Sequence, residues 1–312
     1  MSIAEAGEFG LISRVVNRLG AGPATVLGPG DDAAVVAAAD GRVVVSTDVL
    51  VEGRHFRRDW CGAADVGHRA AAANLADIAA MGARPTALVV ALCVPPDLDV
   101  LWAEELADGL TEEAALVGAS VVGGDMSSSP TLTIAVTALG DLGGRAPVVR
   151  SGAQPGDVVA LAGRTGYAAA GYTVLSRGFR TPKVLVEAYR RPAVPYAAGP
   201  EAAGLGATSL IDISDGLLQD LGHIATASVV GIDIHRDAFS VPDQMRDAAS
   251  ALGVDPYVWL LAGGDDHALA ATFPPGTALP EGWRVVGAVH EGTGVTVDRK
   301  PWQGGTGWDH FR

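Results

Sequence analysis

Carboxylates stand at several strand ends in this sequence. A pair of aspartates ending at Asp32 directly precedes an apolar run, and the next run ends in a Ser-Thr-Asp triplet at Asp48. The segment IDISDG closes a third run with Asp212 and Asp215. Taken singly, an acid after a strand is often a helix N-cap or an Asx-turn. Several together suggest a binding site for cations.

Asp77 strengthens this interpretation because it falls inside the predicted helix 65–81, on a face that is otherwise small and apolar. Such a face is typical of a helix that packs against a sheet. Burying an unpaired carboxylate is costly, and the chain has few bases nearby in sequence to pair these acids. Oxygen ligands suit Mg²⁺. The candidate magnesium ligands are Asp32, Asp48, Asp77, Asp125, Asp212 and Asp215.

Phosphate chemistry must work here with few lysines, since Lys183 and Lys300 are the only two. The chain has no GxxxxGK[ST] motif, which excludes a P-loop, and neither lysine has the strand context of a protein kinase. Mg²⁺, arginines and backbone amides would neutralise phosphates instead, and the loop 163–166 could supply amides at a helix N-terminus. The histidines show no metal-ligand pairing and no GxSxG occurs, so hydrolase classes gain little support. The pattern favours phosphate chemistry that depends on bound Mg²⁺.

Composition narrows the partners and the compartment. Acids outnumber bases 36 to 22, and the net charge of -14 should repel nucleic acid and anionic membrane surfaces. Cys61 and Cys93 are far apart, which argues against a disulfide scaffold or thiolate metal site. The N-terminal segment carries acids where a signal peptide needs bases, and the apolar runs are too short to span a bilayer. We expect a cytoplasmic protein.

Strand-like and helix-like segments predict a mixed α/β or α+β fold. Gly- and Pro-rich residues at 141–157 suggest a boundary between an N-terminal domain, 1–144, and a C-terminal domain, 145–312. Both halves contain Gly-Gly-Asp, at 123–125 and 263–265, which we interpret as a turn and as a hint of internal duplication. Strands are predicted at 42–46, 87–94, 131–139, 158–162, 209–213, 231–234, 267–272 and 284–289, and helices at 64–81, 100–118, 168–176 and 216–228.

In order, these segments resemble the thiamine-monophosphate kinase family, within the superfamily of aminoimidazole ribonucleotide synthetases. The Asp-Asp, Ser-Thr-Asp and Asp-x-Ser-Asp-Gly motifs are shared across the superfamily, whereas GRHF, NLADIAAMG and the terminal WDHF select the kinase. The resemblance covers nearly the whole chain, through GEFGLI (7–12), GPGDDAAV (28–35), STDVLVEGRHF (46–56), ANLADIAAMGARP (73–85), GGDMSSS (123–129), RSGAQPGD (150–157), AGRTGYAAAG (162–171), RRPAVP (190–195), IDISDGLLQDLGHI (211–224), GGDDHAL (263–269) and GWDHF (307–311).

The resemblance implies two α/β domains, with the N-terminal sheets of two subunits forming a barrel across a homodimer and an ATP site between the domains. It implies thiamine monophosphate as substrate, ATP as co-substrate and Mg²⁺ as cofactor. Carried over by position, the Mg²⁺ ligands would be Asp32, Ser46, Thr47, Asp48, Asp77, Asp125, Asp212 and Asp215. The ATP contacts would be Gly124, Asp125, Arg150 and Ser214, and the substrate contacts His55, Asp265 and Trp308.

Two segments depart from the family pattern. GGDDHAL (263–269) stands where the family usually has GGEDYEL, so Asp265 is shorter than Glu, His267 replaces a phenol and Ala268 lacks a carboxylate. Tyr167 and Ala168 stand where Asp and Ser are frequent. Two other functions stay open. One is a superfamily ligase that activates a ribonucleotide amide oxygen as a phosphate. The other is a nucleotide-binding module without turnover.

Overall fold

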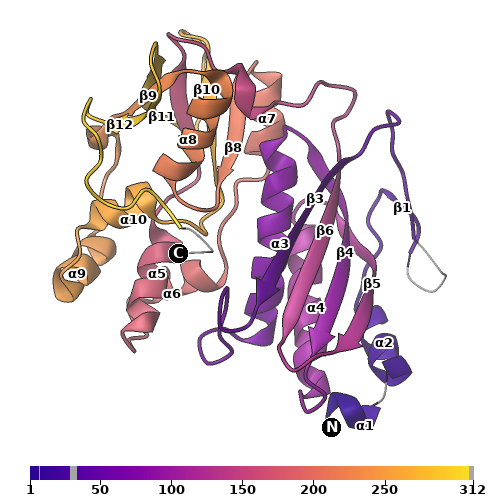
Figure 1. Cartoon of the computed structure of the whole chain (residues 1–312). Coiled ribbons are helices and arrows are strands. Elements are labelled where there is room, and N and C mark those ends of the chain that lie inside the picture. Colours follow the sequence, from indigo (N-terminus) through magenta and orange to yellow (C-terminus); the bar gives the residue numbers. More distant parts are fainter. Residues whose placement is uncertain (7, 29–33, 309–312) are drawn as a thin grey trace. The chain divides into compact units, whose positions relative to one another are not determined.

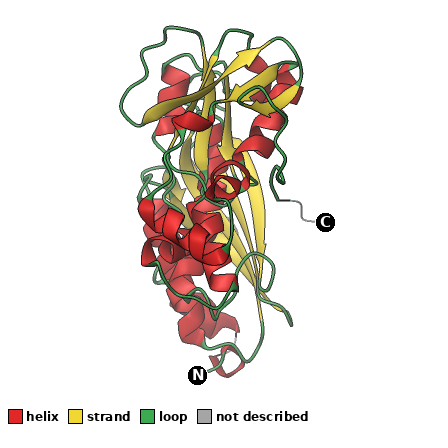
Figure 2. Cartoon of the chain, turned by 90° about the vertical axis from the view of Figure 1, so that its left-hand side faces the viewer, coloured by secondary structure: helices red, strands yellow, loops and turns green. Residues whose placement is uncertain are grey.

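The computed structural model describes residues 1–6, 8–28 and 34–308, which form two compact units. The first comprises Met1–Ile78 and Ala83–Gly144, and the second comprises Ala79–Gly82 and Arg145–Arg312. Asp32, a predicted metal ligand, lies outside the described residues. Helices and strands are mixed through the chain (Figure 2), so the predicted α/β class is confirmed.

The first unit is built on a four-stranded sheet of order β3-β6-β4-β5 (Figure 1), in which β4 and β5 are parallel and the other neighbours antiparallel. A two-stranded antiparallel sheet, β1-β2, accompanies it. The elements are α1 (Ile3–Ala6), α2 (Glu8–Val16), β1 (Thr25–Leu27), β2 (Val35–Val36), β3 (Val44–Val51), α3 (Ala63–Ala80), β4 (Arg84–Val94), α4 (Val100–Ala115), β5 (Ser120–Ser128) and β6 (Thr133–Asp141).

One face of this sheet is covered by α3 and α4 (Figure 1), and the alternation along β6 reflects it, since every second residue from Ile134 to Gly140 is buried. The two helices cross at glycines. A Cβ added at Gly67 would lie 2.3 Å from the carbonyl oxygen of Leu106, and one at Gly109 would lie 2.1 Å from that of Ala64. The backbones are therefore in direct contact at the crossing, which positions α3 under the sheet.

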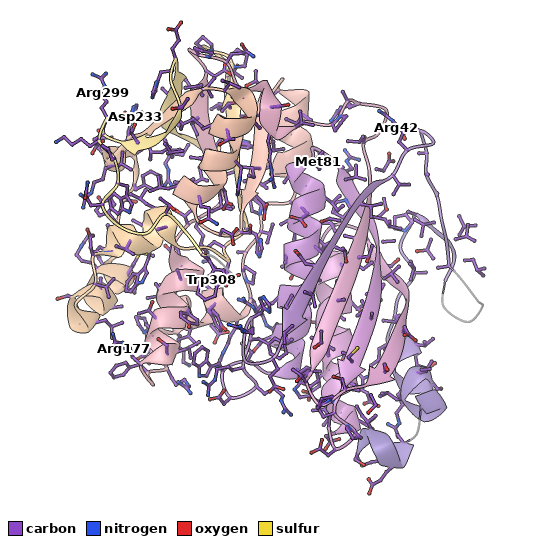
Figure 3. All side chains as sticks on the ribbon, in the orientation of Figure 1. Arg42, Met81, Arg177, Asp233, Arg299 and Trp308 are labelled. Carbon is purple, nitrogen blue, oxygen red and sulfur yellow. The ribbon has the colours of Figure 1, made fainter. Side chains whose placement is uncertain are left out.

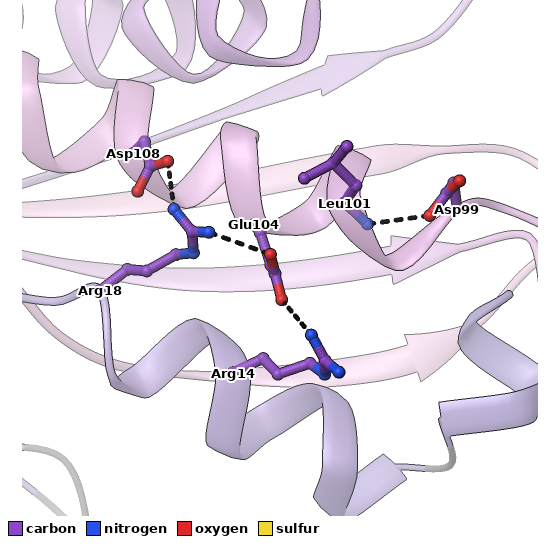
Figure 4. A network of polar contacts seen from close by, with 6 residues as sticks. All are labelled: Arg14, Arg18, Asp99, Leu101, Glu104 and Asp108. Carbon is purple, nitrogen blue, oxygen red and sulfur yellow. Dashed lines mark hydrogen bonds and ion pairs between the residues drawn. The ribbon is translucent and has the colours of Figure 1, made fainter. Parts of the chain in front are cut away.

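Two arginines fix α2 and the residues after it onto α4 (Figure 4). Arg14 donates to Glu104 at 2.8 Å, and Arg18 donates to Glu104 at 2.9 Å and also to Asp108. Leu11 of α2 packs with Val100 and Ala103 of α4. The Arg14 guanidinium, followed by that of Arg18, lowers the pKa of Glu104 below its usual range despite the opposing effect of desolvation. Charge pairing and a small apolar contact together hold this N-terminal segment.

The second unit is built on a six-stranded sheet of order β12-β9-β11-β7-β10-β8, in which β12 and β9 are parallel and the other neighbours antiparallel. All six residues of β10 are buried. The elements are η1 (Arg150–Gly152), β7 (Val158–Ala162), α5 (Tyr167–Ser176), α6 (Lys183–Arg190), α7 (Ala198–Gly204), β8 (Ser209–Ile213), α8 (Leu217–Ser228), β9 (Gly231–Ile234), η2 (Arg236–Ala238), α9 (Asp243–Leu252), α10 (Pro256–Ala262), β10 (Ala268–Phe273), β11 (Trp283–His290) and β12 (Gly294–Val297).

One sequence interpretation is wrong. Gly123–Asp125 lies inside strand β5 and not in a turn, because the β5 backbone pairs with β4 through this segment. Gly263–Asp265 does belong to a turn, so the two Gly-Gly-Asp segments have different structures and do not support a duplication. Over the described part of the chain, the helices all fall short of the length and apolarity needed to cross a bilayer.

Candidate functional site

Strand β3 and helix α3 bring the first group of predicted site residues together. Ser46 Oγ donates to Asp77 Oδ2 at 2.5 Å. Two residues on, the N–H of Asp48 donates to Asn74 Oδ1 at 3.0 Å, and the buried Asn74 side chain donates in turn to the carbonyl of Ala70. Residues 46 and 48 share one side of a strand, and residues 74 and 77 share one face of a helix. The arrangement therefore places Asp48 and Asp77 at the same strand–helix contact.

Thr47 lies on the other side of β3. Its hydroxyl donates to the carbonyl of Val136 at 2.9 Å and accepts from Thr137 Oγ1 at 3.1 Å, so it is bonded to the neighbouring strand β6. The Thr47 side chain is thus directed away from the face that carries Asp48. Its predicted role as a metal ligand is not tested by this arrangement.

His55 lies just beyond β3 with a defined ring orientation. The N–H of Val51 donates to His55 Nδ1 at 3.0 Å, so a neutral ring carries its proton on Nε2 and offers a donor there. The carbonyl of His55 accepts from the buried Arg69 at 3.4 Å. A donor held in this way suits contact with an anionic group.

Asp125 lies on β5, at the sheet edge opposite β3. In register, Asp125 pairs with Ala91, which pairs with Ala135 and then with Val49. Three strand spacings separate the edges, which amounts to about 14 Å. Asp125 is exposed, and next to it a Cβ on Gly124 would lie 2.0 Å from the Val90 carbonyl oxygen. The first unit therefore separates Asp125 from Asp48 and Asp77.

In the second unit, β8 and the turn after it carry the other acids. Asp212 is buried in β8, and its Oδ2 lies 3.1 Å from His267 Nδ1. Ser214 accepts the N–H of Asp265 at 2.8 Å through its carbonyl oxygen. Asp215, which follows directly, accepts from the Gln219 side chain at 3.2 Å. The turns 214–216 and 263–267 thus lie against each other and gather several predicted residues.

Sequence reasoning did not single out Asp220 as a site residue. It lies in the first turn of α8, next to the turn 214–216. Its Oδ2 accepts the N–H groups of Asp215 and Gly216 at 3.1 and 3.0 Å. Desolvation raises the pKa of Asp220 to about 7, and the charges of Asp212 and Asp215 add to this effect. One signal in the sequence could have pointed to Asp220. It stands four residues after Gly216, one turn into a helix that follows an acid-rich strand end.

Asp266 is the second buried acid that sequence reasoning missed. It is 2% exposed, and its Oδ1 accepts the N–H of Ala168 at 3.1 Å, in the first turn of α5. Desolvation raises the pKa of Asp266 to about 7, against the lowering effects of this hydrogen bond and of Arg164. The Ala168 amide, just beyond the loop 163–166, is thus taken by Asp266. The role of the 163–166 amides in binding phosphate stays a prediction.

The other predicted contacts lie on exposed segments of the second unit. Trp308, labelled in Figure 3, is 52% exposed, and its N–H donates to the Asp215 carbonyl at 3.0 Å. Its own carbonyl accepts from Gln219 at 2.7 Å, which places the segment beside the start of α8. Arg150 begins η1 and is exposed, with its carbonyl accepting from Ser228 Oγ at 2.8 Å. Trp308 and Arg150 are therefore both accessible to a ligand from solvent.

The donor set suits a hard cation such as Mg²⁺, although the described residues contain no cluster of three or more His, Cys, Asp or Glu side chains that could hold a metal. Desolvation is the main cause of the raised pKa of Asp220, and the negative charges of Asp212 and Asp215 raise it further. A divalent cation nearby would offset these negative charges. Oxygen ligands of this kind fit Mg²⁺ better than softer metals.

Comparison with known proteins gives the class and then the family. The sequence model of "AIR synthase related protein, N-terminal domain" matches residues 30–142. The chain is 49% identical to the thiamine-monophosphate kinase of Mycobacterium tuberculosis, over 99% of this chain and 93% of that protein. Identity to the Corynebacterium glutamicum thiamine-monophosphate kinase is 39%, over 99% and 95%. The structure of AaThiL complexed with AMPPCP and TMP superposes with a TM-score of 0.82 at 32% identity, covering 100% of this chain and 99% of that one.

The fold and these likenesses therefore place the chain among the enzymes related to AIR synthase. Within that class, the chain belongs to the thiamine-monophosphate kinase family. The family resemblance noted in the sequence is confirmed over essentially the whole chain.

The two buried acids predict how stability depends on pH. Because the folded-state pKa values of Asp220 and Asp266 are raised, the folded state holds more protons than the unfolded state at mildly acidic pH. The free energy of unfolding should therefore fall as pH rises from about 4 to about 7, and then level off. Urea denaturation at about pH 5 and about pH 8 measures the difference. Asp266→Asn should reduce this difference, whereas Asp243→Asn, at an exposed ion pair, should not. An unchanged difference in Asp266→Asn would contradict the assignment.

Proposed function

We propose that the protein phosphorylates thiamine monophosphate to thiamine diphosphate with ATP as donor, in the cytoplasm, as the last step of thiamine diphosphate synthesis. The observation that carries this proposal is the full-length likeness to thiamine-monophosphate kinases, which includes a structure complexed with AMPPCP and TMP. The site residues are compatible with it. His55 offers a donor for a phosphate, and the exposed Trp308 offers an aromatic face for a cationic heterocycle.

The proposed transfer is in-line and needs no protein base. A phosphate monoester has a second pKa near 6, so at neutral pH its oxygen is largely ionised and can attack the γ-phosphorus. The problem that remains is to bring two polyanions together, which makes alignment and charge neutralisation the main tasks of the site. Mg²⁺, when bound, supplies neutralisation of the phosphate charges. The carboxylates carry no obvious proton-transfer role in this scheme.

We assign the residues of this chain to three roles. For the donor nucleotide we propose Gly124, Asp125, Arg150 and Ser214, and for the acceptor His55, Asp265 and Trp308. For Mg²⁺ we propose Asp32, Ser46, Thr47, Asp48, Asp77, Asp125, Asp212 and Asp215. Support comes from the Ser46–Asp77 and Asp48–Asn74 hydrogen bonds, which preform one carboxylate pair, and from the negative charges around Asp220.

We also propose a homodimer formed through the open face of the first unit's sheet. This face carries Val45, Val49 and Val89, which are 59%, 47% and 39% exposed. Exposed apolar side chains that gather on one face of a sheet are often part of an interface. A second copy of the same face would cover it, as the family resemblance implies. The two domains of the subunit, 1–144 and 145–312, are proposed to act together in each copy.

The decisive experiment is an assay with Mg²⁺ and ATP. Thiamine monophosphate should be converted to thiamine diphosphate with one ADP released per product, and formylglycinamidine ribonucleotide should not be turned over. ADP formation that depends on the ribonucleotide and ignores thiamine monophosphate would move the protein to the ligase class. ATP binding without turnover on either compound would make it a binding module.

A further inference from the structure

The turn Gly263–His267 holds an unusual backbone. Asp265 and His267 both have positive φ values, 66° and 51°, which side chains other than glycine adopt rarely. Strained residues of this kind persist where their surroundings over-determine them, and they concentrate at functional sites. Both residues lie at the candidate site, because Asp265 is a proposed substrate contact and His267 contacts Asp212.

One side of this turn is fixed by backbone hydrogen bonds to the strand end of β8. The N–H of Asp265 donates to the Ser214 carbonyl at 2.8 Å, and the N–H of His267 donates to the Ile213 carbonyl at 3.1 Å. Between them the backbones touch, since a Cβ on Gly264 would lie 2.0 Å from the Ser214 carbonyl oxygen. These contacts set the position of the turn relative to β8. Its other side lies against α5, where a Cβ on Gly263 would lie 2.4 Å from Ala169 Cβ.

The Asp266 side chain holds that other side. It points into the interior, where Oδ1 accepts the N–H of Ala168 at 3.1 Å in a fully buried contact with the start of α5. The amide at this position of a helix has no partner within the helix, so an acceptor from outside is needed. Asp266 therefore links the turn to α5 through a side-chain hydrogen bond.

Stability alone does not account for an acid at this position. Asp266 Oδ2 is buried and has no hydrogen-bond partner among the described residues, and burial raises the pKa of the carboxyl to about 7. A carboxyl group kept in such a place, at a cost in desolvation, is expected to perform a task that an apolar side chain cannot. The available task is to accept the Ala168 amide.

We infer that Asp266 is a positioning residue: its buried oxygen fastens the turn Gly263–His267 to the start of α5 and so holds Asp265 and His267 in their strained, site-facing conformations. This inference rests on the proposed function for its kinetic readout. It assigns the effect to the acceptor oxygen rather than to the negative charge.

The experiment compares two substitutions of similar size. Asp266→Asn keeps an oxygen that can accept the Ala168 amide, and Asp266→Leu does not. Asp266→Leu should raise KM for thiamine monophosphate about 10-fold or more, whereas the Kd of a non-hydrolysable ATP analogue changes about 2-fold at most, since a misplaced contact acts on the substrate it touches. Asp266→Asn should retain the wild-type KM within about 3-fold. Hydrogen exchange of the 265–267 amides, measured without substrate, should accelerate in Asp266→Leu and not in Asp266→Asn.

Asp233→Leu is the matched control, because Asp233 is also a buried acid of the second unit, where it accepts from Thr296 Oγ1 at 2.6 Å and from the Arg299 N–H at 2.7 Å. Asp233 and Arg299 are labelled in Figure 3. The control should lose thermal stability while its KM is unchanged. An equal rise in KM in Asp233→Leu would show that the loss of any buried acid from this unit weakens substrate binding. That result would overturn the inference.

Two further outcomes would also overturn it. One is a wild-type KM in folded Asp266→Leu, and the other is a KM raised about 10-fold in Asp266→Asn, which would make charge the decisive property. If Asp266→Leu does not fold, the Asn variant decides by the same criterion. Wild-type protein assayed in parallel separates this test from the proposed function. Absent turnover of thiamine monophosphate by the wild type rejects that function, and the exchange comparison then tests the positioning role by itself.

Discussion

Asp77→Asn is expected to lower kcat by about 100-fold or more while the protein keeps its fold. The amide preserves the shape of the side chain and can still accept from Ser46 Oγ, which donates to Asp77 at 2.5 Å. It removes the negative charge, however, and charge is what a magnesium ligand contributes. Losses of this size are typical when a metal site is disturbed.

Steady-state kinetics at fixed Mg²⁺ concentration measures the loss, and thermal shift gives a second readout. Addition of Mg²⁺ with an ATP analogue should raise the Tm of the wild type and have a smaller effect on Asp77→Asn. Asp65→Asn is the matched control, since Asp65 lies in the first turn of the same helix, where it accepts the N–H of Gly62 at 3.1 Å. Wild-type kcat in Asp77→Asn would show that the metal assignment is wrong.

The local elements of this site could be predicted from the sequence because their signals are local. The alanine-rich face around Asp77 predicted a helix packed on a sheet, and α3 spans Ala63–Ala80 with Asp77 bonded to Ser46 of β3. Strands β7, β8 and β9 have the predicted bounds, since each is a short apolar run between turn residues. The spacing of apolar residues and the local composition were sufficient to predict these elements.

Features that depend on distant pairing could not be predicted in the same way. β5 contains Gly123 and Gly124, which read as a turn, yet pairing with β4 makes the segment a strand. Asp266 and Asp220 look like ordinary surface acids in sequence. They are buried because tertiary contacts place them there, Asp266 against Ala168 and Asp220 beneath the turn at Gly216. Sheet order is a further example, since strand spacing along the chain does not reveal that β3 and β5 form opposite edges.

That sheet order bears on how the proposed magnesium site is assembled. Asp48 lies on β3 and Asp125 on β5, about 14 Å apart across the sheet of one subunit. Ligands of a single Mg²⁺ must lie about 2 Å from the ion. If both residues serve one such site, Asp125 must come from the partner subunit.

The mixing of two inactive variants should therefore restore activity. Asp48→Asn and Asp125→Asn are each expected to be inactive as homodimers. After subunit exchange, a mixed dimer would contain one site with both substitutions and one site with neither. Since random mixing makes half of the dimers mixed, the recovered activity should approach about a quarter of the wild-type value.

Mixing Asp48→Asn with Asp77→Asn is the control, because both residues belong to the same strand–helix contact and no intact site can form. No recovery in the Asp48→Asn and Asp125→Asn mixture, with exchange verified by native mass spectrometry of tagged subunits, would place both aspartates in separate sites or within one subunit's site. A monomeric mass for the wild-type protein would contradict both the proposed dimer and the shared site.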